Sequence, residues 1–216
     1  MEVGKSKKLT SQLICVTVII MLISVIDIII RHYVHDLIGI GSNILYYVLI
    51  TSVVIVTVFK VEKRDIKSLG FYKENIIKQI IIGLIIFGTF AAINVIPLLF
   101  NVDKSYVVNF KPKSVEQLVS FLLFDIFCVG FGEEIIYRGY FLPRIKDITN
   151  SWIVAILVSS IVFGLWHLPS QPITPAIIGI IFATLKVKVK DCSTLSLSIA
   201  HGLNDAFLIL LGWILL

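Results

Sequence analysis

Six residues in the C-terminal half of this chain have types and spacings that can support hydrolysis. They are Glu133, Glu134, Arg138, His167, His201 and Asp205. A carboxylate can take a proton from water, and a neutral imidazole can bind a metal ion or relay a proton. Residues four apart on a helix share a face. Glu134 and Arg138 can therefore form an ion pair, and His201 can contact Asp205.

Glu133 differs from its neighbour because it has no local cation. It lies about 100° around the helix from Glu134 and therefore faces away from Arg138. This leaves Glu133 as the free carboxylate, a candidate general base or metal ligand. The spacing leaves the question of a metal open, since the chain has no HExxH motif and no compact run of three ligands. The three cysteines form no CxxC pair.

The composition places these residues in a membrane. Of 216 residues, 57% are hydrophobic and only 15% are charged, and the mean hydropathy is +0.98. Soluble domains carry about a quarter of charged residues. The composition therefore excludes a soluble enzyme, a disordered regulator and a nucleic-acid-binding domain. It predicts an all-α, polytopic bundle of transmembrane helices in contact with lipid.

We expect about seven spans, because a bilayer core about 30 Å thick requires roughly 20 apolar residues of helix. Ser114 is a suitable N-cap for the fourth, and Pro169 and Pro172 should close the fifth. The sixth is short enough to be a tilted or partial span. The expected spans are Leu9–Ile30, Leu37–Phe59, Ile80–Phe100, Val115–Leu142, Ser151–Leu168, Ile173–Leu185 and Thr194–Leu216.

The distribution of basic residues predicts the orientation. Fifteen of the 19 Lys and Arg residues fall on one side if the spans are as expected, which puts the N-terminus in the cytoplasm. We divide the single membrane domain into N-terminal helices, 1–113, and a catalytic helical core, 114–216. The loop at 60–78 mixes charges with apolar side chains and should lie along the inner headgroup layer.

Charged side chains are energetically unfavourable inside the membrane. Each costs about 2.5–3.5 kcal/mol at the centre of a helix. They must pair, coordinate an ion or line a wet cavity. By helical rise, Glu133 and His201 lie roughly 14 and 16 Å from the inner ends of their spans, and His167 roughly 24 Å from its own. We expect the three segments to converge in a cavity that opens towards the cytoplasm.

Three short motifs resemble those of one protease family. EEIIYR at Glu133–Arg138, FGLWH at Phe163–His167 and HGLND at His201–Asp205 are similar to EExxxR, FxxxH and Hxxx(N/D). These are the motifs of the CPBP family, the CAAX proteases and bacteriocin-processing enzymes, also called the Abi family. It includes the type II CAAX prenyl endopeptidase. The resemblance covers residues 114–216.

The resemblance implies an intramembrane metalloendopeptidase. Glu133 with His167 would activate water, and Arg138 would hold Glu134 in place. His201 and Asp205 would bind metal or stabilise the oxyanion. The implied cofactor is a divalent metal, zinc by kinship, with His167, His201, Glu133 and Asp205 as its ligands. Many relatives have asparagine in place of Asp205, and a carboxylate cannot donate an N–H to an oxyanion. Either Asp205 is a ligand, or Asn204 supplies the amide.

We therefore expect a multi-pass peptidase of the bacterial cytoplasmic membrane. Its substrate would be a peptide or small membrane protein, such as a bacteriocin or signal peptide or a CAAX-like tail. One alternative is a non-catalytic membrane scaffold or bacteriocin-immunity protein that keeps the motifs as structural contacts. Another is a small transporter or proton-coupled channel, since membrane carboxylates and histidines also form relays.

Overall fold

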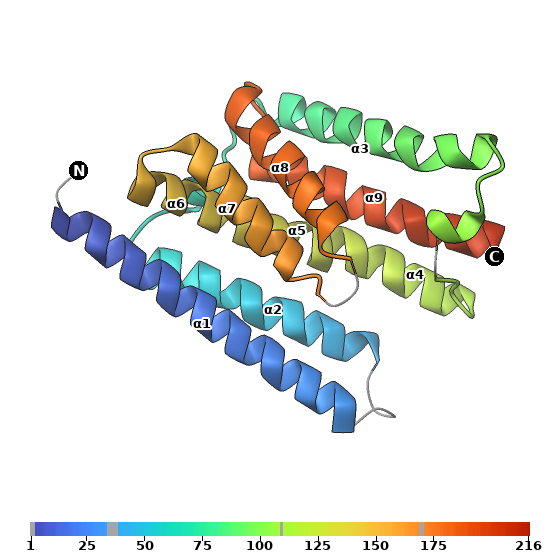
Figure 1. The fold of residues 1–216 in the computed structure, drawn as a ribbon, viewed down its shortest axis with the longest axis horizontal. Coiled ribbons are helices and arrows are strands. Elements are labelled where there is room, and N and C mark those ends of the chain that lie inside the picture. The colour runs from blue at the N-terminus through green and yellow to red at the C-terminus, as the bar shows by residue number, and fades with distance from the viewer. Residues whose placement is uncertain (1–2, 34–38, 109, 169–170) are drawn as a thin grey trace.

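The computed structural model describes residues 3–33, 39–108, 110–168 and 171–216 (Figure 1). Leu37 and Pro169, expected to begin the second span and to close the fifth, lie outside these residues. The described residues form helices and no strand, which confirms the all-α prediction. The principal helices are α1 (Val3–Tyr33), α2 (Ile40–Val56), α3 (Ile76–Leu99), α4 (Val115–Phe124), α5 (Gly130–Glu134), α6 (Leu142–Thr149), α7 (Trp152–Leu165), α8 (Ile173–Lys188) and α9 (Thr194–Leu215).

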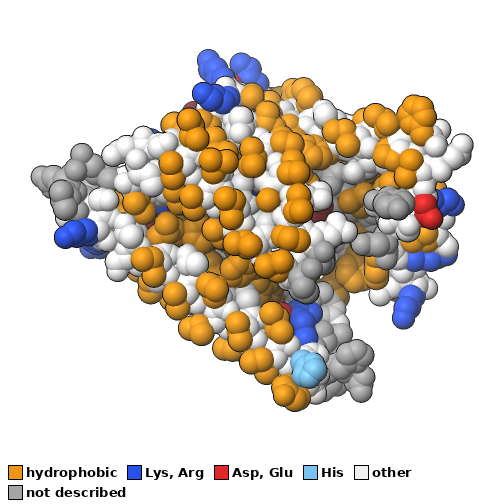
Figure 2. All heavy atoms as spheres, viewed as in Figure 1, with side chains coloured by type: hydrophobic (Ala, Val, Ile, Leu, Met, Phe, Trp, Pro, Cys, Tyr) orange, Lys and Arg blue, Asp and Glu red, His pale blue; other side chains and the backbone are white. Residues whose placement is uncertain are grey.

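Four segments of the described chain are long and apolar enough to cross a membrane, by length and composition. They are Ser6–Tyr33, Ile40–Val61, Ile76–Leu99 and Thr194–Leu215. The apolar helices α7 and α8 are shorter. Figure 2 shows hydrophobic side chains across the middle of the visible face and Lys and Arg near its edges. This is the surface of an integral membrane protein. The cytoplasmic position of the N-terminus stays a prediction.

The expected fourth span is one continuous helical run from Val115 to Thr149. It begins as predicted, because the Oγ of Ser114 accepts a hydrogen bond from the backbone N–H of Gln117 at 3.2 Å. Two π-helical stretches interrupt its α-helical geometry, η5 (Asp125–Val129) and η6 (Ile135–Phe141). Such π-helical turns are frequent at functional sites. Here η5 and η6 flank α5, which carries both glutamates of the first motif.

Helix α9 lies against this run and also against α3, while α1 packs beside α2 and α7 beside α8 (Figure 1). The crossing of α5 and α9 depends on Gly130 and Gly202. A Cβ atom on Gly130 would lie 2.6 Å from the backbone nitrogen of Gly202. Only two glycines permit backbones to approach this closely. The crossing brings Glu133 and Glu134 next to His201.

The loop after α2 is part of the fold and not only a surface segment. Its 3₁₀ helix η3 (Ile66–Leu69) places Leu69 in the core, fully buried. The carbonyl of Leu69 accepts a hydrogen bond from Thr194 Oγ1 at 2.6 Å, at the start of α9. The buried Arg144 pairs with Glu62 at 2.6 Å. The sequence pattern therefore did not predict these buried contacts of the loop. The position of the loop relative to the lipid headgroups stays a prediction.

Candidate active site

The centre of the site is Glu134, which is fully buried. Its Oε1 accepts a hydrogen bond from Arg138 Nη1 at 2.9 Å, which confirms the predicted i,i+4 ion pair. The same oxygen lies 2.9 Å from Nδ1 of His201. Glu134 thus joins the first and third motifs, and it fixes the orientation of the His201 ring.

Glu133 is also buried, with 7% of its surface exposed. Its Oε1 accepts a hydrogen bond from the hydroxyl of Tyr47 at 2.7 Å. Its Oε2 is buried, has no hydrogen-bond partner among the described residues, and lies 3.7 Å from Nε2 of His201. Glu133 therefore faces the histidine of the third motif from the side opposite Glu134, with one carboxylate oxygen held and the other available.

Asp205 completes the surroundings of His201. Its Oδ2 lies 3.3 Å from Nε2 of His201, as the i,i+4 spacing predicts. Asn204 directs its amide nitrogen towards Asp205 Oδ1 at 3.4 Å, and its amide oxygen accepts a hydrogen bond from Asn94 at 2.9 Å. Both candidates for the polar residue of the third motif thus lie at the site, and Asn94 of α3 orients the amide.

His167 lies in the turn that follows α7, and not within the helix as the expected span had it. Its Nδ1 is 2.8 Å from the carbonyl oxygen of Phe163, and the two rings meet edge to face with centroids 4.8 Å apart. Because α7 ends at Leu165, this histidine sits at the helix terminus. The depth of His167 in the membrane stays a prediction.

Phe163 packs against the site, as its place in the motif suggests. The guanidinium carbon of Arg138 lies 4.3 Å from the centroid of the Phe163 ring and 5.5 Å from that of Phe182. Both rings also lie 6.1 Å from the His201 ring. Stacking between two aromatic faces stabilises the arginine by cation–π attraction and limits its movement.

Two cavities meet at the predicted residues. One, of about 260 Å³, lies between α3, α7, α8 and α9 and is lined by His167, His201, Asn204 and Asp205. The other, of about 480 Å³, lies between α1, α2 and the end of α7, and both Glu133 and His167 line it. His167 is thus a wall residue of both cavities. The three motifs converge on one region of the helical bundle.

A catalytic zinc takes three protein ligands and keeps one open position. His201 and the unpartnered Oε2 of Glu133 face each other, but Nδ1 of His201 is engaged with Glu134. Within the described ranges, no three His, Cys, Asp or Glu side chains are grouped so that they could hold a metal ion. The divalent metal and its four ligands stay a prediction.

The site holds three polar atoms that are buried and unpartnered in the part of the chain that the structure describes: Oε2 of Glu133, Oε2 of Glu134 and Nη2 of Arg138. A buried polar atom without a partner costs about 1–3 kcal/mol. Three such atoms in one site indicate that the site is arranged to bind another group, such as a water molecule or part of a substrate, at a cost in stability. A carboxylate with one held and one available oxygen can accept a proton from water.

Sequence reasoning missed the contributions of α2. Tyr47 bonds to Glu133, and the hydroxyl of Tyr46 accepts a hydrogen bond from Trp166 Nε1 at 3.1 Å, next to His167. The available signal was a pair of tyrosines within an otherwise apolar span. Their partners are 86 and 120 positions away, which no local spacing rule can identify.

The comparison with protein families agrees with the motifs. Residues 115–207 match the family model of type II CAAX prenyl endopeptidase Rce1-like proteins. This confirms the resemblance found in the sequence, and the matched segment contains all six predicted site residues. No curated protein and no solved structure matched the chain.

Proposed function

We propose that this protein is an intramembrane endopeptidase that hydrolyses a peptide bond with water activated by Glu133. The observation that carries the proposal is the buried, unpartnered Oε2 of Glu133, 3.7 Å from Nε2 of His201. The family match supports a protease of the CAAX type, because its glutamate and histidine motifs are the residues that converge here.

In the first step, Oε2 of Glu133 accepts a proton from a water molecule, and the water oxygen attacks the scissile carbonyl carbon. A positioned general base of this kind contributes about 10²–10⁴-fold to a rate. Glu134 holds His201 through Nδ1, so that Nε2 points to the same place. Arg138 holds Glu134 in place by its ion pair at 2.9 Å.

In the second step, the tetrahedral intermediate collapses and the amine leaves. Its developing charge requires a proton, which Glu133 returns from Oε2. The oxyanion requires N–H donors. We propose as these donors Nε2 of His201 in its doubly protonated form, 3.7 Å from Glu133 Oε2, and the amide nitrogen of Asn204, 3.4 Å from Asp205 Oδ1. Asp205, as a carboxylate, orients His201 and does not donate.

The cavities suggest the kind of substrate. Both lie among apolar helices, and the larger one is bordered by exposed side chains of α1 such as Met21 and Ile28. A substrate would reach Glu133 from within the membrane, as a small membrane protein or a lipid-attached peptide. We propose processing of a CAAX-like tail, a bacteriocin or a signal peptide in the bacterial cytoplasmic membrane.

A search for new protein termini tests this function without assuming a substrate. Membranes of cells that express the wild type are compared by terminal-peptide mass spectrometry with membranes that express Glu133→Gln at the same level. We expect one or more membrane-protein termini that depend on Glu133. Identical termini in both samples would favour the non-catalytic scaffold or immunity protein, in which the motifs serve only as structural contacts.

A further inference from the structure

Tyr47 determines which oxygen of Glu133 is available. Its hydroxyl donates to Oε1 at 2.7 Å, so this oxygen is occupied and the carboxylate cannot rotate without breaking the bond. The other oxygen is the one without a partner in the described chain, and it faces Nε2 of His201. A carboxylate that is held through one oxygen keeps the other oxygen in a fixed position, which is the preorganisation that favours a general base.

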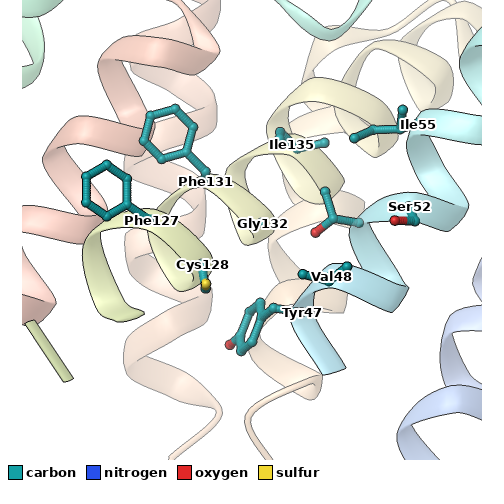
Figure 3. A pocket seen from close by; sticks show the side chains of 10 residues that line it. Tyr47, Val48, Ser52, Ile55, Phe127, Cys128, Phe131, Gly132 and Ile135 are labelled. Carbon is teal, nitrogen blue, oxygen red and sulfur yellow. The ribbon is translucent and has the colours of Figure 1, made fainter. Parts of the chain in front are cut away.

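The Tyr47 ring is itself fixed by its neighbours. It meets the rings of Phe124 and Tyr46 edge to face, with centroids 5.5 and 5.4 Å apart. The chain has glycine where the ring crosses α5. A Cβ atom on Gly132 would lie 3.0 Å from Cδ1 of Tyr47. Figure 3 shows Tyr47 of α2 and Gly132 of α5 along the same apolar groove.

The preceding residue connects α2 to the second motif. The hydroxyl of Tyr46 accepts a hydrogen bond from Trp166 at 3.1 Å and shares another with Ser24 of α1 at 2.8 Å. Consecutive tyrosines therefore contact the glutamate motif and the residue before His167. Helix α2 spans the two halves of the site, although it lies outside residues 115–207, which match the family.

We infer that Tyr47 is a positioning residue for Glu133, so that α2 of the N-terminal half is part of the hydrolytic site. This inference rests on the proposed function. A residue that only stabilised the fold would change the amount of folded enzyme and leave the turnover of each folded molecule unaltered. A residue that orients the base lowers kcat and leaves KM unchanged.

The first experiment measures hydrolysis of a farnesylated, internally quenched CAAX peptide by the full chain in proteoliposomes. We expect Tyr47→Phe to lower kcat about 10- to 100-fold, the range for partners that orient a reacting group, with KM within about twofold. Gly132→Ala should lower kcat in the same direction, because its methyl group displaces the Tyr47 ring. A kcat for Tyr47→Phe within twofold of the wild type would overturn the inference.

Two matched controls separate positioning from general damage. Tyr33→Phe removes a hydroxyl from an exposed tyrosine at the end of α1, and Gly88→Ala adds a methyl group where nothing lies within 4 Å. Both should keep the wild-type kcat and KM. Thermal unfolding in detergent should show that Tyr47→Phe is folded at the assay temperature, so that its loss of kcat belongs to the folded enzyme.

A second measurement needs no substrate. Dicyclohexylcarbodiimide modifies carboxyl groups in apolar surroundings, and mass spectrometry of the Glu133 peptide gives the rate. Because the Tyr47 hydroxyl covers Oε1, we expect Glu133 in Tyr47→Phe to react at least threefold faster than in the wild type or Tyr33→Phe. Equal rates overturn the inference. A faster rate in a protein whose wild type cleaves nothing supports the contact and counts against the proposed function alone.

Discussion

Arg138 and Arg144 lie six residues apart on the same helical run, and both are almost completely buried. Every nitrogen of the Arg144 guanidinium has a partner. Nε and Nη2 donate to the carboxylate of Glu62, and Nη1 donates to the carbonyl of Ser68 at 2.8 Å. Among the described residues, Arg138 donates through Nη1 to Glu134, and its Nη2 has no partner.

The difference separates a structural cluster, around Arg144, from the cluster around Arg138 that we propose to be reactive. Around Arg144, the ion pair with Glu62 and the hydrogen bond to the carbonyl of Ser68 attach the loop after α2 to α6. The carboxylate of Glu62 neutralises the buried charge of Arg144. Around Arg138, each of the two glutamates has one oxygen without a partner among the described residues, and the one on Glu133 lies 3.7 Å from Nε2 of His201. Buried polar networks that are complete stabilise a fold, whereas incomplete ones are costly and are kept where a ligand completes them.

The largest expected difference is between substitution of a carboxylate in the Arg138 cluster and substitution of one in the Arg144 cluster. Glu133→Gln keeps an oxygen that accepts from Tyr47 but removes the base, so hydrolysis of the farnesylated quenched peptide should fall by about 10³-fold. Its thermal unfolding midpoint should stay near that of the wild type. Glu62→Gln should show the reverse, with a lower midpoint and unchanged kcat. Equal loss of activity in both variants would remove the distinction between the two clusters.

Substitution of Arg144 measures how much its cluster contributes to the free energy of unfolding. Arg144→Met removes the 2.6 Å ion pair of the buried Glu62 carboxylate and leaves it the longer 3.6 Å contact to Arg64, so we expect a loss of about 3 kcal/mol in the free energy of unfolding. The double variant Glu62→Gln/Arg144→Met should recover part of this loss, because no buried charge then lacks its partner. Reversible unfolding in mixed micelles gives these values. Additive losses in the double variant would contradict a coupled pair.

The two clusters also differ in how far the sequence predicts them. The pairs Glu134–Arg138 and His201–Asp205 follow from helical spacing, because local geometry alone brings residues four apart together. Arg144 and Glu62 are 82 positions apart, and the residues between them show no pattern that would join the two. The same limit applies to Tyr47, whose role depends on how α2 packs against α5.

The sequence predicts which segments are helical better than it predicts where each helix ends. The four long apolar segments were recognisable because helices that span a bilayer require long apolar runs. The end of α7 before His167 was missed, and so were the π-helical stretches beside Glu133 and Glu134. A π-helical turn depends on the fit between neighbouring helices, such as the Gly130–Gly202 crossing, and single-segment periodicity does not contain that information.

Metal analysis tests whether the reactive cluster binds an ion. If zinc is the cofactor, purified wild type should carry about one equivalent, and His167→Ala and His201→Ala should each lose at least 90% of it, since a catalytic zinc depends on all three protein ligands. Glu62→Gln, altered in the structural cluster, should keep the metal. A wild-type protein without bound metal after purification in zinc-containing buffer would make the metal prediction wrong.

The smallest effect is expected at Asp205. Its Oδ2 contacts Nε2 of His201 at 3.3 Å, and an asparagine oxygen can occupy the same position. Asp205→Asn should therefore keep kcat within about threefold, the scale of less than 1 kcal/mol. Asn204→Ala, which removes the amide that Asn94 orients, should reduce kcat more. If instead Asp205→Asn abolishes hydrolysis and Asn204→Ala does not, the carboxylate of Asp205 is itself required and the amide of Asn204 is not the oxyanion donor.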